Sequence, residues 1–270
     1  ILNKPLRELC GPETPYHIVA VKRGEDTVIP GGNDSLELGD IAYFMTLRKH
    51  VQHILQITGK GDYGEVRHMM IMGGGLTTYH VIQDKPDSVS VKVIEQSEER
   101  CRQFADMLDD PDVSIIQGDG RDTGMLAEEG LRDMQAFAAL TPYTETNILA
   151  CLAAKRMGVR KTIAMVENMD YVSLAEKLDI GTIINKKTIA ASHIYQMMLD
   201  TDVANVKCLT IANADVAEFI ASEGSIVTEK PVRDLRLPRG VTLGGLVRNG
   251  SGFPIHGNTQ IQPDDRVVVF

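Results

Sequence analysis

An apolar run followed by three consecutive glycines constrains this chain more than any other stretch. It reads Val66-Arg-His-Met-Met-Ile-Met-Gly-Gly-Gly-Leu-Thr-Thr-Tyr79. A short continuous apolar run is typical of a strand buried on both faces of a parallel sheet, and the glycines allow a sharp turn into a helix. About 22 residues after Gly73, the segment Val89-Ser-Val-Lys-Val-Ile-Glu95 predicts a second strand that ends in an acid. This layout is typical of a mononucleotide-binding βαβ unit.

Residues 66–185 continue this alternation of strands and helices, and a further helix follows it. The remaining apolar segments predict a series of strands, and the segments between them show helical spacing of apolar side chains. We predict strands at 69–72, 89–94, 113–117, 136–140, 162–166 and 182–184, and helices at 98–108, 145–157, 171–178 and 187–199. Regular alternation of this kind predicts an α/β fold with a Rossmann-like, doubly wound parallel sheet.

The two ends of the chain repeat each other. Leu6-Arg-Glu-Leu9 recurs as Val232-Arg-Asp-Leu235, and residues 18–24, 28–33 and 38–40 recur as 243–250, 253–258 and 263–265. The offset is about 225 residues (258 minus 33). We therefore expect two copies of one small α+β domain, at 1–58 and 205–270, to flank a nucleotide-type domain at 66–200. The glycine-rich residues 59–65 have the composition of a linker. Such an array is expected to be cut from a longer chain.

Composition excludes several classes of function. The net charge is -9 and no run of Lys or Arg stands out, so we expect no nucleic-acid partner. No apolar run approaches the ~20 residues that a membrane-spanning helix requires. His50 and His53 lie one helical turn apart but have no third ligand at suitable spacing, so no metal site is predicted. The cysteines, which are widely spaced, suit a reducing compartment: Cys10, Cys101, Cys151 and Cys208.

The glycines are the first candidate binding residues. Gly73, Gly74 and Gly75 would let the backbone approach a phosphate, and the helix start at Leu76 and Thr77 would offer unpaired N–H groups. The third place of the G-x-G-x-x-G pattern holds Thr78, whose bulk is expected to crowd the helix against the strand. Two interpretations stay open: a ligand site, or a tight turn whose ligand site has decayed.

Polar residues at the strand ends complete the candidate site. Glu95 would accept hydrogen bonds from both ribose hydroxyls, which favours NAD or an adenosine nucleotide over NADP. Thr141 ends the fourth strand and would turn its hydroxyl toward a phosphate or a second ribose, or simply begin a loop with Pro142. Arg100 would either stack on an adenine or, as we favour, belong to a solvated helix face.

The segment after the fourth strand has residue types that favour helix starts. We expect Thr144, Glu145 and Asn147 to cap the next helix. Asp119 lies between two glycines after the third strand, where an ordinary Asp-Gly turn is one interpretation.

Several of these segments, taken in order, resemble the RCK family, the regulators of potassium conductance, and most of all its Trk-type potassium-uptake regulatory subunits. They are Ile71-Met-Gly-Gly-Gly75, Val93-Ile-Glu-Gln96, Glu98-Glu-Arg-Cys101, Gly118-Asp-Gly120, Ala139-Leu-Thr141 and Glu145-Thr-Asn147, together with the flanking repeat. Members of full length run N-domain, C-domain, N-domain, C-domain. The resemblance implies a first C-domain at 1–58, a second N-domain at 66–200 and a second C-domain at 205–270. It also places Asp119 near an adenine ring.

The resemblance implies a non-enzymatic function. The chain would sense NAD(H) or an adenine nucleotide (ATP or ADP), form dimers that assemble into a ring, and gate a Trk-type membrane potassium transporter from the cytoplasmic side, peripheral to the inner face of the membrane. Two alternatives remain. An NAD-dependent oxidoreductase would need an acid or base near the nicotinamide, and the flanking repeats show none. A structural repeat with a degenerate nucleotide site is favoured by Leu76 and Thr78.

Overall fold

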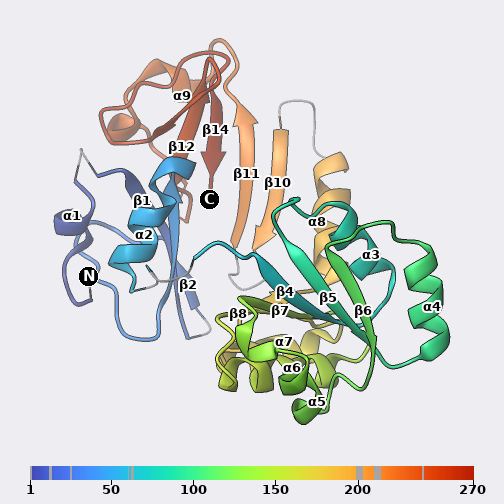
Figure 1. Cartoon of the computed structure of the whole chain (residues 1–270). Helices are drawn as coiled ribbons and strands as arrows, with labels where there is room; N and C mark the ends of the chain where they lie inside the picture. The colour runs from blue at the N-terminus through green and yellow to red at the C-terminus, as the bar shows by residue number, and fades with distance from the viewer. Residues whose placement is uncertain are drawn as a thin grey trace. The chain divides into compact units, whose positions relative to one another are not determined.

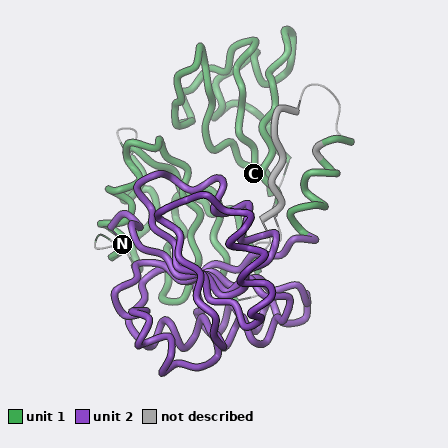
Figure 2. The backbone as a smooth tube through the Cα atoms, turned by 45° about the vertical axis from the view of Figure 1, so that its right-hand side comes forward, with its two compact units in different colours: residues 1–62, 188–270 green, residues 63–187 purple. Residues whose placement is uncertain are grey.

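The computed structural model describes the chain except for residues 1, 12, 13, 25, 60, 62, 63, 199–202, 210–213 and 239 (Figure 1). The chain divides into two compact units, one formed by residues 1–62 with 188–270 and the other by residues 63–187 (Figure 2). Parts of the predicted linker 59–65, the last residue of the predicted helix 187–199 and the predicted domain boundary near residue 200 lie outside the described residues. Among the described residues, no helix is both long and apolar enough to cross a membrane.

The unit formed by 63–187 is built on one parallel sheet. Its six strands lie in the order β6-β5-β4-β7-β8-β9, and every neighbouring pair is parallel. The strands are β4 (His68–Met72), β5 (Ser90–Glu95), β6 (Val113–Gln117), β7 (Ala136–Ala139), β8 (Lys161–Met165) and β9 (Thr182–Ile184). This order, with its reversal between β4 and β7, is that of a Rossmann-type doubly wound sheet. The predicted fold class is confirmed, and each strand of this sheet lies within one residue of its predicted bounds.

Helices cover both faces of this sheet (Figure 1). They are α3 (Leu76–Gln83), α4 (Glu98–Asp106), α5 (Thr123–Glu128), α6 (Thr144–Arg156) and α7 (Val172–Lys177). Because side chains alternate along a strand, Ile71 packs in a core with side chains of α3 and α4, whereas Met70 and Met72 pack with those of α5 and α6. The sheet is therefore buried on both sides, as the apolar runs predicted.

The other unit contains two antiparallel sheets. One has the order β2-β1-β3, with β1 (Tyr16–Arg23), β2 (Asp26–Val28) and β3 (Ile41–Thr46). The other has the order β10-β11-β14-β12-β13, with β10 (Val203–Leu209), β11 (Ala214–Ile220), β12 (Leu243–Arg248), β13 (Ser251–Pro254) and β14 (Arg266–Val269). Helices α1 (Leu6–Leu9), α2 (Val51–Ile57) and α9 (Ile226–Glu229) accompany these sheets, and α8 (Lys186–Met198) follows the parallel sheet along the chain.

The two antiparallel sheets repeat one structural pattern. The order β2-β1-β3 recurs as β13-β12-β14. Arg23 pairs with Asp26 across β1 and β2, and Arg248 pairs with Ser251 across β12 and β13. Even the irregularity in register recurs, between Ile18 and Ala20 in β1 and between Leu243 and Gly245 in β12. The offset of 225 (248 minus 23) is the one found in the sequence.

A buried carboxylate fork anchors each copy of the pattern. Arg23 donates to both carboxylate oxygens of Asp40 and to the carbonyl of Ser35. At the same offset, Arg248 donates to both oxygens of Asp265 and to the carbonyl of Gln260. The arginine in each fork holds the pKa of its aspartate below the usual value. The two antiparallel sheets therefore have equivalent anchors, and the division of the chain into three domains stays a prediction.

Candidate functional site

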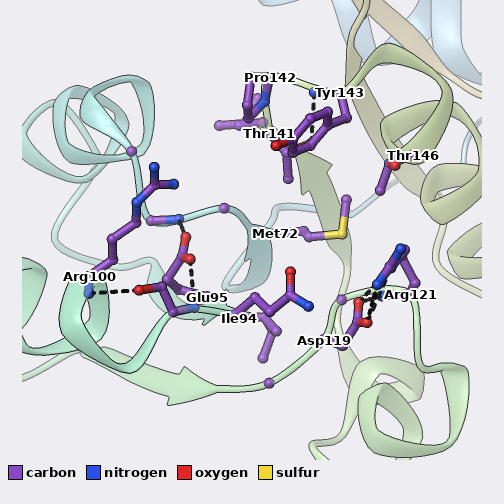
Figure 3. A pocket seen from close by; sticks show the side chains of 18 residues that line it. Met72, Ile94, Glu95, Arg100, Asp119, Arg121, Thr141, Pro142, Tyr143 and Thr146 are labelled. Carbon is purple, nitrogen blue, oxygen red and sulfur yellow. Dashed lines mark hydrogen bonds and ion pairs between the residues drawn. The ribbon is translucent and has the colours of Figure 1, made fainter.

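A pocket of about 380 Å³ opens where the strand order reverses, at the carboxyl ends of β4, β5, β6 and β7. Ligands of open α/β sheets bind in this position, because loops that leave neighbouring strands in opposite directions leave a crevice between them. Four loops contribute the lining (Figure 3). The candidate residues Gly73, Gly74, Gly75, Glu95, Asp119 and Thr141 all line this pocket.

Gly73 makes the turn out of β4. Its φ is +107°, a backbone conformation that side chains with a Cβ rarely adopt. A Cβ here would lie 3.2 Å from both the backbone nitrogen and Cγ2 of Thr141. The Gly73 N–H donates to the carbonyl of Ile94 at 2.8 Å, which ties the turn to β5. A glycine is therefore required both by the backbone angle and by the close approach to the neighbouring loop.

Glu95 is the last residue of β5 and is buried, with 7% of its surface exposed. Its Oε2 accepts from the Gly74 N–H at 2.8 Å, and its Oε1 accepts from the Ser97 N–H at 2.9 Å. Figure 3 shows both bonds. Each carboxylate oxygen has a second lone pair for a further donor. Glu95 thus orients two acceptor oxygens at the pocket while it connects two of the loops.

Helix α3 begins beside Glu95. Gly75 is its N-cap residue, and among the described side chains none caps its N–H groups. The first N–H groups of a helix have no partner within the helix, so they are available to an anion. Leu76 is 71% exposed, and neither Leu76 nor Thr77 is among the lining residues. What these two residues offer is the backbone N–H.

Thr78, which the sequence led us to expect to crowd the helix against the strand, has a polar partner inside the turn. It is fully buried, and its hydroxyl donates to the carbonyl of Gly73. The side chain is accommodated because its polar atom has a backbone partner inside the turn.

Asp119 lies on the loop after β6 and forms an ion pair with Arg121. The Arg121 guanidinium donates to Oδ1 from Nε at 2.9 Å and to Oδ2 from its terminal nitrogen at 2.6 Å. These bonds, with a further one from the Arg121 backbone N–H, hold the pKa of Asp119 below its usual value. Asp119 is therefore a charged acceptor already matched by a cation, and the pair lines the pocket together (Figure 3).

Thr141 is held by Asn147 from the next helix. The Thr141 hydroxyl donates to Asn147 Oδ1 at 2.6 Å, and the Asn147 Nδ2 donates to the Thr141 carbonyl at 2.7 Å. The same Nδ2 donates to the carbonyl of Met165 at 2.8 Å. Asn147 is fully buried, so this network fixes the ends of β7 and β8 against each other.

The predicted capping role of Thr144, Glu145 and Asn147 is wrong. The N-cap residue of α6 is Tyr143, which makes no side-chain cap hydrogen bond. The Thr144 hydroxyl instead accepts from the backbone N–H of Glu167 at 3.1 Å. The polar residues at this helix start point to the adjacent loop because parallel strands bring that loop next to them.

Sequence reasoning missed some of the pocket. Arg121 was not selected, although its position two residues after Asp119 could have indicated a local ion pair. Arg100 was favoured as part of a solvated helix face; it is exposed and also lines the pocket. Tyr143 also lines the pocket, on the loop between Thr141 and α6 (Figure 3).

Comparison of the chain with protein-family models identifies the class of protein to which its parallel sheet and its last antiparallel sheet belong. Residues 69–186 match the family model of the TrkA-N domain, and residues 216–270 match that of the TrkA-C domain. These two matches together cover more than half of the chain, which therefore contains a TrkA-N domain and a TrkA-C domain.

Relatives are named as Trk potassium uptake proteins. The chain is 30% identical over 275 residues to the Trk system potassium uptake protein TrkA of Azorhizobium caulinodans, a match that covers 100% of this chain and 59% of the relative. It is 27% identical to the protein of the same name from Halomonas elongata, with 96% of this chain and 57% of the relative covered. The chain therefore spans less than two thirds of the length of these relatives.

Solved structures that match parts of this chain include RCK domains. The crystal structure of the GsuK RCK domain is matched over 98% of this chain and 55% of that one, with a TM-score of 0.48 and 14% identity. A GsuK channel bound to NAD is matched over 80% of this chain and 41% of that one, with a TM-score of 0.47 and 14% identity.

Proposed function

We propose that the pocket at the carboxyl edge of the parallel sheet binds NAD(H) or an adenine nucleotide such as ATP or ADP. The observation that carries this proposal is Glu95. A buried carboxylate whose two oxygens are held by backbone N–H groups has its remaining lone pairs directed for a pair of hydroxyl donors. A ribose supplies such a pair. The pocket volume of about 380 Å³ lies within the usual range for small-molecule sites.

The neighbouring groups suit the rest of a nucleotide. The N–H groups at the start of α3 follow the glycine turn directly and favour a phosphate. Arg100 brings positive charge to the same pocket, where Arg121 is matched by Asp119. The Asp119–Arg121 pair lies on the loop that we assign to the base. Gly73, Gly74, Gly75 and Thr141 would shape the space between these contacts.

The acidic side chains of the pocket support binding over proton-transfer chemistry. Glu95 accepts from two backbone N–H groups, and Asp119 is matched by Arg121. The ion pair with Arg121 holds the pKa of Asp119 below its usual value, so Asp119 is a poor proton acceptor near neutral pH. We therefore propose a regulatory module and rank an oxidoreductase below it.

We further propose that the full-length protein is the nucleotide-sensing regulatory subunit of a Trk-type potassium uptake system. The names of its relatives support this role. The subunit would form dimers that assemble into a ring at the cytoplasmic face of the membrane transporter. Binding would gate transport by favouring one of two arrangements of the N- and C-domains, which requires a difference in ligand affinity between them.

Calorimetric titration with ADP, ATP, NAD and NADH tests the binding proposal. Glu95→Ala should lower the affinity for the nucleotide that binds about 10- to 100-fold, as expected for the loss of hydrogen bonds to a charged group. Glu99→Ala is the matched control, because Glu99 is exposed on α4, outside the pocket, and pairs with Gln103. Absence of binding by all four nucleotides would contradict the proposal. Turnover of NADH with a small substrate would favour an oxidoreductase.

Transport measurements test the regulatory role. Potassium uptake by proteoliposomes that hold the Trk-type transporter and the full-length protein should depend on the bound nucleotide. The Glu95→Ala variant should lose that dependence, and Glu99→Ala should keep it. Uptake that is insensitive to nucleotide with the wild-type protein would contradict gating.

A further inference from the structure

The peptide group between Gly73 and Gly74 is held from both sides. Its carbonyl oxygen accepts a hydrogen bond from the Thr78 hydroxyl, and its N–H donates to Glu95 Oε2 at 2.8 Å. Thr78 and Glu95 are both buried. Two side chains on different elements therefore fix the orientation of one peptide plane in the glycine loop.

This clamp matters because glycine pairs lose more conformational freedom on ordering than any other residues. When binding a ligand must order such a loop, the free energy of ordering is subtracted from the binding free energy, so the affinity is lower. Thr78 is the third residue of α3, so its hydroxyl ties the glycine turn to the helix start. The next N–H groups along the chain, those of Gly75, Leu76 and Thr77, are then held in place before a ligand arrives.

We propose that Thr78 is a positioning residue for phosphate binding, which preorganises the N–H groups of residues 75–77 through the Gly73–Gly74 peptide. This inference rests on the proposed nucleotide site. The third position of the glycine pattern thus carries a hydroxyl that contributes to binding, rather than a side chain that impairs it. The ligand class affected is the phosphorylated one, since a nucleoside without phosphate makes no contact at the start of α3.

The test compares ADP with adenosine on matched variants of the whole chain. Thr78→Val keeps the shape of the side chain and removes the donor, whereas Thr78→Ser keeps the hydroxyl. Thr78→Val should lower the affinity for ADP about five- to tenfold, which is equivalent to the loss of one neutral hydrogen bond. The affinity for adenosine should stay within about twofold of the wild-type value. Thr78→Ser should bind both ligands like the wild type. A general loss of structure would weaken ADP and adenosine alike.

Amide hydrogen exchange in the ligand-free protein supplies a second readout. The Gly74 N–H should be protected in the wild type and in Thr78→Ser, and should exchange faster in Thr78→Val. A folded Thr78→Val variant with wild-type affinity for ADP would overturn the inference. Rapid exchange of Gly74 in the wild type would also overturn it, and decides the matter if Thr78→Val does not fold. Failure of the wild type to bind any nucleotide would instead overturn the proposed function, and the phosphate-binding role with it.

Discussion

Gly73 and Gly75 belong to the same motif but have different physical requirements. Gly73 combines a φ of +107° with a Cβ position 3.2 Å from Thr141, whereas a Cβ on Gly75 would meet nothing within 4 Å. Gly75 also has ordinary extended backbone angles. At this scale the turn depends on the first glycine and tolerates a side chain at the third.

Gly73→Ala is predicted to destabilise the protein by about 1–3 kcal/mol, because alanine must adopt a strained backbone and push against the Thr141 loop. Nucleotide affinity should fall with it. Gly75→Ala is the matched control and should stay within about 0.5 kcal/mol of the wild type. Urea unfolding gives both values. Equal stability of the two variants would contradict this account of the turn.

Single residues differ in how far the sequence predicts them. Glu95 was predictable, because strand and glycine spacing fix its place at the sheet edge. The bonds from Gly74 and Ser97 to its oxygens were not, since they depend on how two loops fold over one another. Arg121 makes a local contact that no helical or strand period reveals. Leu76 and Thr77 stay predicted site residues, and only their backbone N–H groups would face a ligand, since neither residue lines the pocket.

At the scale of elements, Asn147 shows how α6 is attached to the sheet. Its amide satisfies Thr141 at the end of β7 and the Met165 carbonyl at the end of β8. The residue types at this helix start predicted capping, but the contacts that form are those with neighbouring strands. Parallel strands bring distant loops together, and local sequence carries no sign of which loops these are.

Asn147→Ala should cost about 2–3 kcal/mol, because it leaves buried backbone groups without partners. Denaturant unfolding measures this cost. Glu145→Ala, on an exposed position of the same helix, should cost less than about 1 kcal/mol. A cost for Asn147→Ala as small as that for Glu145→Ala would refute the proposed attachment.

The repeated forks at Asp40 and Asp265 are a second element-scale feature, and they predict a pH dependence. The pKa of each carboxyl is lower in the folded protein than the ~3.9 of an unfolded chain. Their stabilisation is therefore complete above about pH 5 and is lost as the pH falls through the folded pKa.

Asp265→Asn should remove about 1.5–3 kcal/mol at pH 7, the range for hydrogen bonds to charged groups, and less in acid. Asp40→Asn should behave alike. Asp264→Asn is the control, since Asp264 is exposed at a φ of 67° that asparagine tolerates. Unfolding measured at several pH values checks the result. A deficit for Asp265→Asn that is the same at every pH would speak against the forks as its source.

The sequence predicted the parallel strands closely and other elements less well. Short apolar runs bounded by turn residues predict buried strands such as β4. Helix α5 escaped prediction because it has six residues and one fully buried apolar position, Leu126. Strands β10 and β11 also escaped, since β11 is placed by pairing with β14, which lies far along the chain.

At the scale of the whole molecule, the unit formed by 63–187 contains every residue that lines the pocket. Its strands and helices bury two cores of their own. Such a unit is expected to fold by itself. The flanking repeats would then contribute to the conformational response that follows nucleotide binding, and not to the affinity for the nucleotide.

The excised segment 63–187 is predicted to unfold cooperatively and to bind ADP within about threefold of the affinity of the whole chain, since domains with their own core fold independently. Circular dichroism and calorimetry check the two statements. A folded segment that no longer binds would show that the flanking repeats complete the site.

The central claim is that Glu95 and the start of α3 hold a nucleotide at the switch point of the sheet. A crystal structure of the protein grown with saturating ADP tests it most directly. The account predicts the ribose hydroxyls on the Glu95 carboxylate and the diphosphate against the N–H groups of residues 75–77. An empty pocket, or ADP bound elsewhere on the molecule, would contradict it.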